Sequence, residues 1–297
     1  MFKNTLVGVD GRPNSRDGIA LASRLTDPDG ALTLAHVHAG RLRPTHAVSP
    51  ALIRDEAQTA SKLLEDERAA ADVQARIVRI EALSPGRGLH GQAEEQDADL
   101  LVVGSCRHGV LGRAMLGDDT RAALNGAPCA VAIAPVGYAN EPKEIARIGI
   151  AYNGSPESRQ ALAVARELAT QTGASLHALE VVSIPTFAYA GVVAPTAGDG
   201  LDEMLEEANA RLGKLTDIEG RAAYGLAGEE LAAFGDEVDL LIVGSRGYGP
   251  LRRLMLGSTS DYLQRHARCP LLVLPRPATV EDDEDSEPAA RETVAAA

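Results

Sequence analysis

The chain has 297 residues, of which 45% are hydrophobic and 24% are charged, and its formal net charge is -13. This length accommodates two domains of ordinary size, each able to bury its own core. The acidic balance is the opposite of the basic surface used in general nucleic-acid binding, so we expect no nucleic-acid partner.

No apolar run reaches the roughly 20 residues that a membrane span needs. The first residues, MFKNTLVGVD, lead directly into a strand pattern without a cleavable signal segment. We therefore expect a cytoplasmic protein with no membrane partner. The 3 cysteines, Cys106, Cys129 and Cys269, form no C-x-x-C pair, which indicates reduced thiols and no metal or redox site.

Strand patterns alternate with helical spacing in the first half of the chain. Asn14 or Ser15 is expected to cap the first helix, which runs to about Leu25. The later helices are expected at 51–71, 86–96 and 120–125, and the strands at 4–10, 31–38, 75–82, 99–104 and 129–135.

The second half repeats this order. The segment DLLVVGS at 99–105 matches DLLIVGS at 239–245, an offset of 140 residues from Asp99 to Asp239, which indicates an internal duplication. Strands are expected at 146–153, 175–182, 219–223, 239–244 and 269–275, and helices at 156–171, 201–215, 228–234 and 258–266.

Alternating strands and helices predict a parallel sheet covered on both faces. We expect two tandem, Rossmann-like, doubly wound α/β domains, each with a five-stranded parallel sheet, at 1–138 and 144–276. Residues 277–297, acidic and then Ala-rich, are expected to form a disordered tail. Ligands of such sheets bind at the carboxyl ends of strands where the strand order reverses, here between strands one and four of each repeat.

The stretch VGSRGYGPLRRLMLGST at 243–259 places glycines at 244, 247 and 257, followed by two hydroxyl residues. Glycines let the backbone approach a ligand closely, and a helix start offers free amides to an anion. The stretch therefore predicts a nucleotide phosphate cradle. Turn glycines and a helix cap without a ligand are the alternative. Arg252 and Arg253 either reach a phosphate or form a solvated basic edge.

These residues resemble the universal stress protein family in its tandem two-domain form, which has an adenine nucleotide alpha hydrolase-like fold. ATP-binding members carry the pattern G-x2-G-x9-G-[S/T], which Gly244, Gly247, Gly257 and Ser258 reproduce. The turn IAYNGSPES at 150–158 and the ending RHARCPLLVLP look similar too. The resemblance covers nearly everything from about 2 to 276.

The resemblance implies that ATP, together with Mg²⁺, binds the second repeat. In similar proteins an acidic residue ends strand one and helps to hold the base, whereas here Asn153 stands in that place and lacks the charge. The nucleotide-binding residues that the resemblance implies are Tyr152, Asn153, Val181, Val243, Gly244, Gly247, Gly257, Ser258 and Thr259.

The first repeat departs from the pattern. It keeps Asp10 at the end of strand one, but Arg107 replaces the second glycine and Asp118 replaces the serine. A side chain would crowd the phosphates and a carboxylate would repel them. We expect one nucleotide per chain, in the second domain. A weak second site at Asp10, Gly104 and Gly117 stays open, as does the alternative that Asp10 caps a turn.

The preferred function is an ATP-binding stress-response or signalling module. The sequence offers no Ser-His-Asp set, P-loop lysine or paired carboxylates, so we assign no catalytic residue and no metal ligand; His36 and His38 lack further ligands. A slow ATPase or autophosphorylating enzyme using Ser258, and a nucleotide-free scaffold, are the alternatives. The resemblance implies that the repeats pair through their fifth strands, and chains could further form a homodimer.

Overall fold

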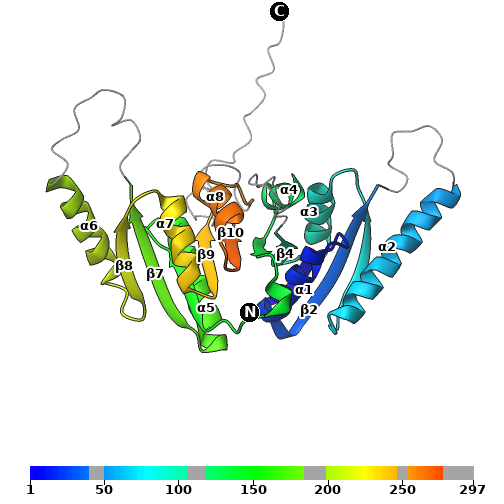
Figure 1. The fold of residues 1–297 in the computed structure, drawn as a ribbon, viewed down its shortest axis with the longest axis horizontal. Coiled ribbons are helices and arrows are strands. Elements are labelled where there is room, and N and C mark those ends of the chain that lie inside the picture. The colour runs from blue at the N-terminus through cyan, green and yellow to red at the C-terminus, as the bar shows by residue number, and fades with distance from the viewer. Residues whose placement is uncertain (40–49, 106–117, 184–198, 246–252, 277–297) are drawn as a thin grey trace, which may run out of the picture.

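The computed structural model describes residues 1–39, 50–105, 118–183, 199–245 and 253–276. The chain forms one 10-stranded sheet with helices on both faces, as Figure 1 shows. The first five strands are β1 Phe2–Gly8, β2 Thr26–His38, β3 Arg76–Glu81, β4 Leu100–Gly104 and β5 Ala130–Ala134. The others are β6 Arg147–Ala151, β7 Ser175–Val182, β8 Glu219–Tyr224, β9 Leu240–Gly244 and β10 Leu271–Leu274.

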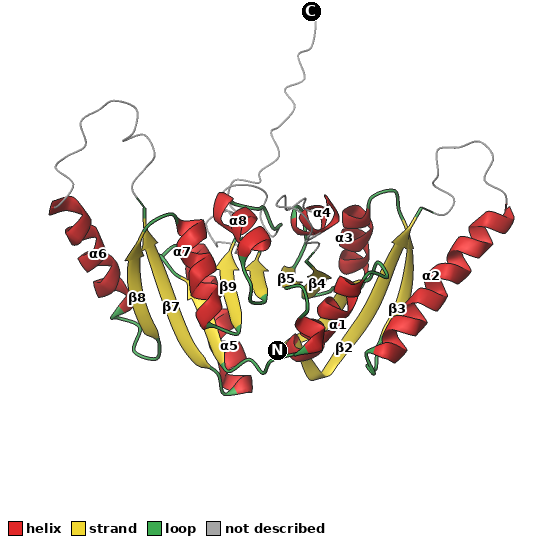
Figure 2. Ribbon diagram, in the orientation of Figure 1, coloured by secondary structure: helices red, strands yellow, loops and turns green. Residues whose placement is uncertain are grey.

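The helices lie between these strands in chain order (Figure 2). In the first half they are α1 Pro13–Leu25, α2 Pro50–Ala70, α3 Pro85–Glu95 and α4 Asp118–Leu124. In the second half they are α5 Pro156–Thr172, α6 Asp199–Leu212, α7 Ala227–Phe234 and α8 Ser258–His266. Short 3-10 turns, η2 Tyr138–Asn140 and η4 Gly235–Glu237, were not expected from the sequence.

The strand order is β3-β2-β1-β4-β5-β10-β9-β6-β7-β8, so each half has the same order and the fifth strands meet in the middle. Strands pair in parallel except at this junction, where β5 and β10 are antiparallel, with Leu272 opposite Ala132. The expected pairing of the repeats through their fifth strands is therefore confirmed. Within each half the order reverses between strands one and four, β1 with β4 and β6 with β9, as predicted.

Two apolar layers hold the helices to the sheet. One layer joins α1, α2, α5 and α6 to one face and includes the fully buried Leu25 and Ile148. The other joins α3, α4, α7 and α8 to the opposite face and includes Leu124 and Leu263. Each layer contains residues of both halves, so the sheet and both layers continue across the junction between the repeats.

The beginning of α1 corrects one expectation. The helix starts at Pro13 after the extended Arg12, and no side chain caps it, so the prediction of a cap at Asn14 or Ser15 is wrong. Proline at the first helical position explains the start, because its fixed φ suits a helix and its missing N–H is not needed there. The Ser15 hydroxyl instead donates to Asp10 Oδ1 at 2.8 Å.

Candidate functional site

The strand ends of the second half form the edge where a ligand was expected. Tyr152 follows β6, is 9% exposed and donates its N–H to the Leu179 carbonyl at 3.1 Å. Val243 lies near the end of β9 and is 3% exposed, while Val181 on β7 is half-buried. The β6 and β9 ends are neighbours, so these predicted site residues come from adjacent strands at the reversal point.

Asn153 and Asp10 occupy equivalent turns after the first strand of each half. Asn153 Oδ1 accepts the Ser155 N–H at 3.1 Å, and Asp10 Oδ1 accepts the Arg12 N–H at 3.0 Å. Both side chains therefore stabilise the turn locally, the alternative noted for Asp10. Replacement of the acid by an amide at 153 keeps this role, since only an acceptor oxygen is needed.

Gly244, at the end of β9, is required by packing of the protein itself. A Cβ atom at this position would lie 2.6 Å from the Glu157 Cβ and 3.1 Å from the Glu157 carbonyl carbon, in the first turn of α5. Gly104 has the same relation to Asn14 in α1. Close helix-to-strand packing therefore accounts for both glycines, with or without a ligand.

Gly257 is the residue immediately before α8, and its N–H donates to the Ser260 hydroxyl at 2.9 Å. Ser258 is exposed and Thr259 half-buried in the first turn of this helix. The first amides of a helix have no intrahelical partner and favour an anion. Ser260, which the sequence argument missed, fixes the turn at the start of the predicted cradle.

Part of the predicted site lies outside the described residues. These positions are Gly117 and Arg107 in the first repeat and Gly247 and Arg252 in the second. Asp118 is the first residue of α4, at the place that Ser258 holds in α8. The contacts of the second motif glycine therefore remain a prediction.

An ion pair with a buried carboxylate lies beside the turn after β6 and was not expected from the sequence. Glu180 on β7 is 6% exposed and accepts from Arg211 Nε at 3.1 Å. The hydrogen bond to Glu180 raises the pKa of Arg211. A Cβ on Gly154 would lie 3.0 Å from Arg211 Cδ, so the arginine stem runs against that turn. Glu180 therefore pairs with α6 on one face of the sheet, whereas the neighbouring Val181 packs against the layer on the other face.

Ser245 directly follows Gly244 and is 8% exposed. Its hydroxyl is buried and has no hydrogen-bond partner within the part of the chain that the structure describes. Buried hydroxyls normally find a partner. The group is therefore a further polar position at the end of β9, and only its place in the motif stretch could have indicated it.

The equivalent edge of the first half holds a small cavity of about 90 Å³. Asp10, His36 and Gly104 are among its lining residues, and His36 Nδ1 bonds the Val9 carbonyl at 2.7 Å. Small-molecule sites usually measure about 300–1,000 Å³. The cavity that the described residues line is therefore smaller than such sites.

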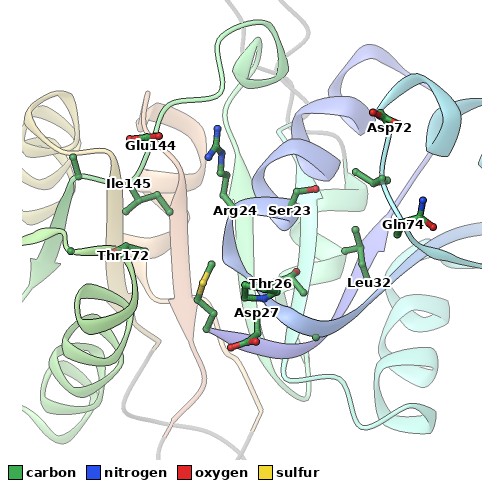
Figure 3. A pocket seen from close by; sticks show the side chains of 16 residues that line it. Ser23, Arg24, Thr26, Asp27, Leu32, Asp72, Gln74, Glu144, Ile145 and Thr172 are labelled. Atoms are coloured by element: carbon green, nitrogen blue, oxygen red, sulfur yellow. The ribbon is translucent and has the colours of Figure 1, made fainter.

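A larger hollow of about 690 Å³ lies between the two halves at the opposite edge of the sheet (Figure 3). Arg24 and Asp27 line it from the first half, and Glu144 and Thr172 from the second. These residues lie at the amino ends of the strands, whereas ligands of doubly wound sheets bind at the carboxyl ends. The expected nucleotide site is therefore separate from this hollow.

A Ser-His-Glu row also lies at the amino ends. Ser175 Oγ is 2.9 Å from His177 Nε2, and His177 Nδ1 is 3.3 Å from Glu219 Oε2. The Glu219 side chain is 86% exposed, and the Ser175 hydroxyl also donates to the Ala146 carbonyl at 3.3 Å. The row is a solvent-facing polar network on the edge away from the cradle.

The described residues contain no group of three or more His, Cys, Asp or Glu side chains placed to hold a metal ion. Nor does any helix in those parts of the chain have the length and apolar character to cross a membrane.

Comparison with known proteins decides the family. The model of the universal stress protein family matches residues 1–135 and again residues 144–275. The chain belongs to the universal stress protein family. Two matches in tandem agree with the duplicated strand order of the sheet.

Related universal stress proteins come from bacteria and archaea. A universal stress protein of Mycobacterium tuberculosis is 29% identical over 184 residues, 60% of this chain and 62% of the relative, so the match spans less than two thirds of its length. One from Thermus aquaticus is 35% identical over 136 residues, 42% of this chain and 95% of that protein. A universal stress protein structure from Archaeoglobus fulgidus has the same fold, with a TM-score of 0.64, 19% identity and 92% and 98% coverage of the two chains.

Proposed function

We propose that this universal stress protein binds one adenine nucleotide, ATP, in its second domain, residues 144–276. Nucleotide occupancy would serve a stress-response or signalling role in the cytoplasm. The first domain, 1–138, carries the degenerate motif, and 277–297 is proposed as an acidic disordered tail. Mg²⁺ would accompany the phosphates, as in many nucleotide sites.

The start of α8 carries the proposal. Gly257 precedes the helix, and Ser258 and Thr259 supply hydroxyls in its first turn. The β6 and β9 ends, with Tyr152 and Val243, lie at the reversal of strand order. A helix start facing such an edge suits phosphates, because free amides and the helix dipole both favour negative charge.

Calorimetry with ATP and Mg²⁺ tests the proposal, with Gly257→Asp as the disabling variant and Gly91→Asp as its control on an open helix surface, where a Cβ meets nothing within 4 Å. We expect binding by the wild type and the control and none by Gly257→Asp, because a carboxylate would repel the phosphates. A wild-type chain without affinity for any adenine nucleotide favours the scaffold alternative.

Exposure of Ser258 at the helix start keeps one enzymatic alternative open. Transfer of the γ-phosphoryl group of ATP to Ser258 Oγ would break the β–γ bridge bond and release ADP and the hydroxyl proton. Mass analysis after incubation with ATP separates the two cases. A phosphate on Ser258 supports autophosphorylation, whereas unmodified chain with bound ATP supports the binding module.

A further inference from the structure

The segment that leads into Gly257 is bound to the first half of the chain. The Gly126 N–H donates to the Leu254 carbonyl at 2.9 Å, and the Leu254 N–H donates to the Ala127 carbonyl at 2.9 Å. Leu254 is fully buried in the apolar layer that also contains Leu124 and Ala127. Backbone and side chain of the motif segment are therefore fixed against the turn that follows α4.

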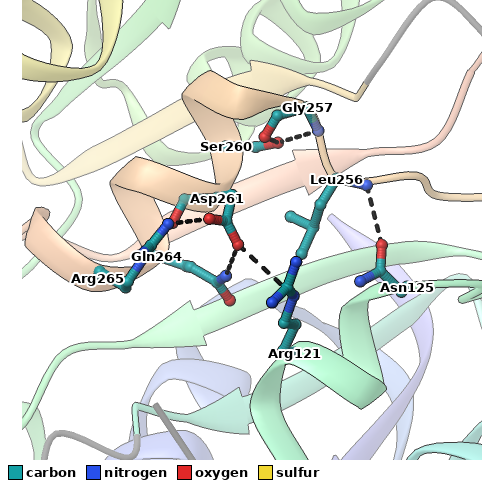
Figure 4. Close-up of polar contacts among 8 residues, drawn as sticks. All are labelled: Arg121, Asn125, Leu256, Gly257, Ser260, Asp261, Gln264 and Arg265. Atoms are coloured by element: carbon teal, nitrogen blue, oxygen red, sulfur yellow. Dashed lines mark hydrogen bonds and ion pairs between the residues drawn. The ribbon is translucent and has the colours of Figure 1, made fainter. Parts of the chain in front are cut away.

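Side chains extend this contact on both sides. Asn125 Oδ1 accepts the Leu256 N–H at 3.2 Å (Figure 4). Arg253 donates to the Gly126 carbonyl at 3.0 Å and pairs with Glu94 Oε1 at 2.6 Å. The Arg253 side chain, 46% exposed, thus lies at the solvent-facing edge, where Glu94 and the Gly126 carbonyl bind it. It joins the motif segment to α3 and α4.

The second repeat has different residue types at the positions equivalent to Asn125 and Gly126. At the offset of 140, Asn125 corresponds to Arg265 and Gly126 to His266. Gly126 has a φ of 93°, a conformation that glycine adopts without strain and other residues rarely adopt. Arginine has no acceptor to offer an amide, and Arg265 is bound to Asp261. The Asn125 side-chain contact therefore has no counterpart of the same type at Arg265, and residues 113–116, which correspond to 253–256, lie outside the described residues.

We propose that the first domain is the positioning partner of the nucleotide site in the second. Asn125 and Gly126 hold Leu254 and Leu256, which fixes Gly257 and the first turn of α8 for the phosphates. This inference rests on the proposed nucleotide binding. By linkage, a bound nucleotide must strengthen the contact between the domains as much as the contact strengthens binding.

The test compares ATP with adenosine on the complete chain. Asn125→Ala should weaken ATP binding by about three- to tenfold, the loss expected for one hydrogen bond. Adenosine affinity should stay unchanged, because the support acts on the phosphate end of the site. Asn209→Ala is the matched control: Asn209 Oδ1 likewise accepts a backbone N–H, that of Ala222 at 3.0 Å, but lies on α6 away from the cradle.

Each outcome decides the inference. Selective loss for ATP in Asn125→Ala, with the control unchanged, supports the positioning role. Equal loss for ATP and adenosine, an equal loss in Asn209→Ala, or no loss in Asn125→Ala overturns it while the proposed function stands. A wild-type chain that binds neither ligand contradicts the proposed function and this inference together.

Discussion

Arg121 and Asp261 occupy equivalent positions in the two repeats and form an ion pair with each other at 3.8 Å across the junction (Figure 4). The offset of 140 relates them, so pairing of two identical repeats would bring two arginines or two aspartates together at this place. The opposite charges match the two halves of one chain to each other.

Reversing the charge of Arg121 tests whether the Arg121–Asp261 ion pair stabilises the junction. Arg121→Asp would set two carboxylates against each other, and we expect a loss of about 0.5–1 kcal/mol in unfolding free energy, small because the Arg121 side chain is 58% exposed. The loss should shrink at high salt. Urea unfolding measures it, with Arg87→Asp on the exposed side of α3 as the control. An equal loss in the control contradicts a specific contact.

The Glu180–Arg211 ion pair should contribute more to the free energy of unfolding than the Arg121–Asp261 pair does. Arg211→Met would leave a buried carboxylate without its partner, at an expected cost of about 1–3 kcal/mol, reduced from that of a fully buried pair because the Arg211 side chain is 43% exposed. The double variant Glu180→Leu with Arg211→Met should recover most of the loss, since no charge remains buried. Urea unfolding of the single and double variants measures both. A double variant as unstable as Arg211→Met would show that arginine packing, not charge, stabilises this region.

Substitution of Gly244 distinguishes a role of this glycine in packing from a role in ligand binding. Gly244→Ala should lose about 1–3 kcal/mol without any nucleotide, because the new methyl group would overlap Glu157. Gly91→Ala, in α3 with open space around it, should gain about 0.5–1 kcal/mol from helix propensity. Thermal unfolding of the ligand-free proteins compares them. An unchanged melting temperature for Gly244→Ala would mean that this glycine serves the ligand alone.

The two buried cysteines predict a loss of stability at high pH. Burial raises the pKa of both Cys129 and Cys269 from 9.0 to about 12. Between these values the unfolded chain releases thiol protons that the folded chain keeps, so stability is complete below about pH 9 and falls as the pH rises toward about 12. The same burial should slow the reaction of Cys129 and Cys269 with a thiol reagent at pH 8. Titration of the native Cys106→Ser chain measures this reaction. Rapid reaction of both thiols would contradict their burial.

Much of the fold could be predicted because its signals are local. The buried strand β4 Leu100–Gly104 has a continuous apolar run, LLVV, and the helix 258–266 begins after a glycine and ends where expected. The prediction of a side-chain cap for α1 was wrong because Pro13 already sets the helix start. The Ser15 hydroxyl hydrogen-bonds Asp10 instead. Local signals thus locate elements better than they assign side-chain partners.

The parts of the site that depend on tertiary contact could not be predicted. Nothing local indicates that Asn125 supports Leu256 from the other repeat, or that Glu180 finds Arg211 on α6. Outside the site, the row Ser175, His177 and Glu219 likewise combines alternate positions of one strand with a residue of its neighbour. Such sets become visible only when strand register and helix placement are known.

Native mass spectrometry of the purified chain with ATP tests the central claim most directly, because it counts nucleotides per chain. The account predicts one adenine nucleotide, lost in Gly257→Asp and retained in Asp10→Ala. Two nucleotides per chain, or one that persists in Gly257→Asp and disappears in Asp10→Ala, would contradict it.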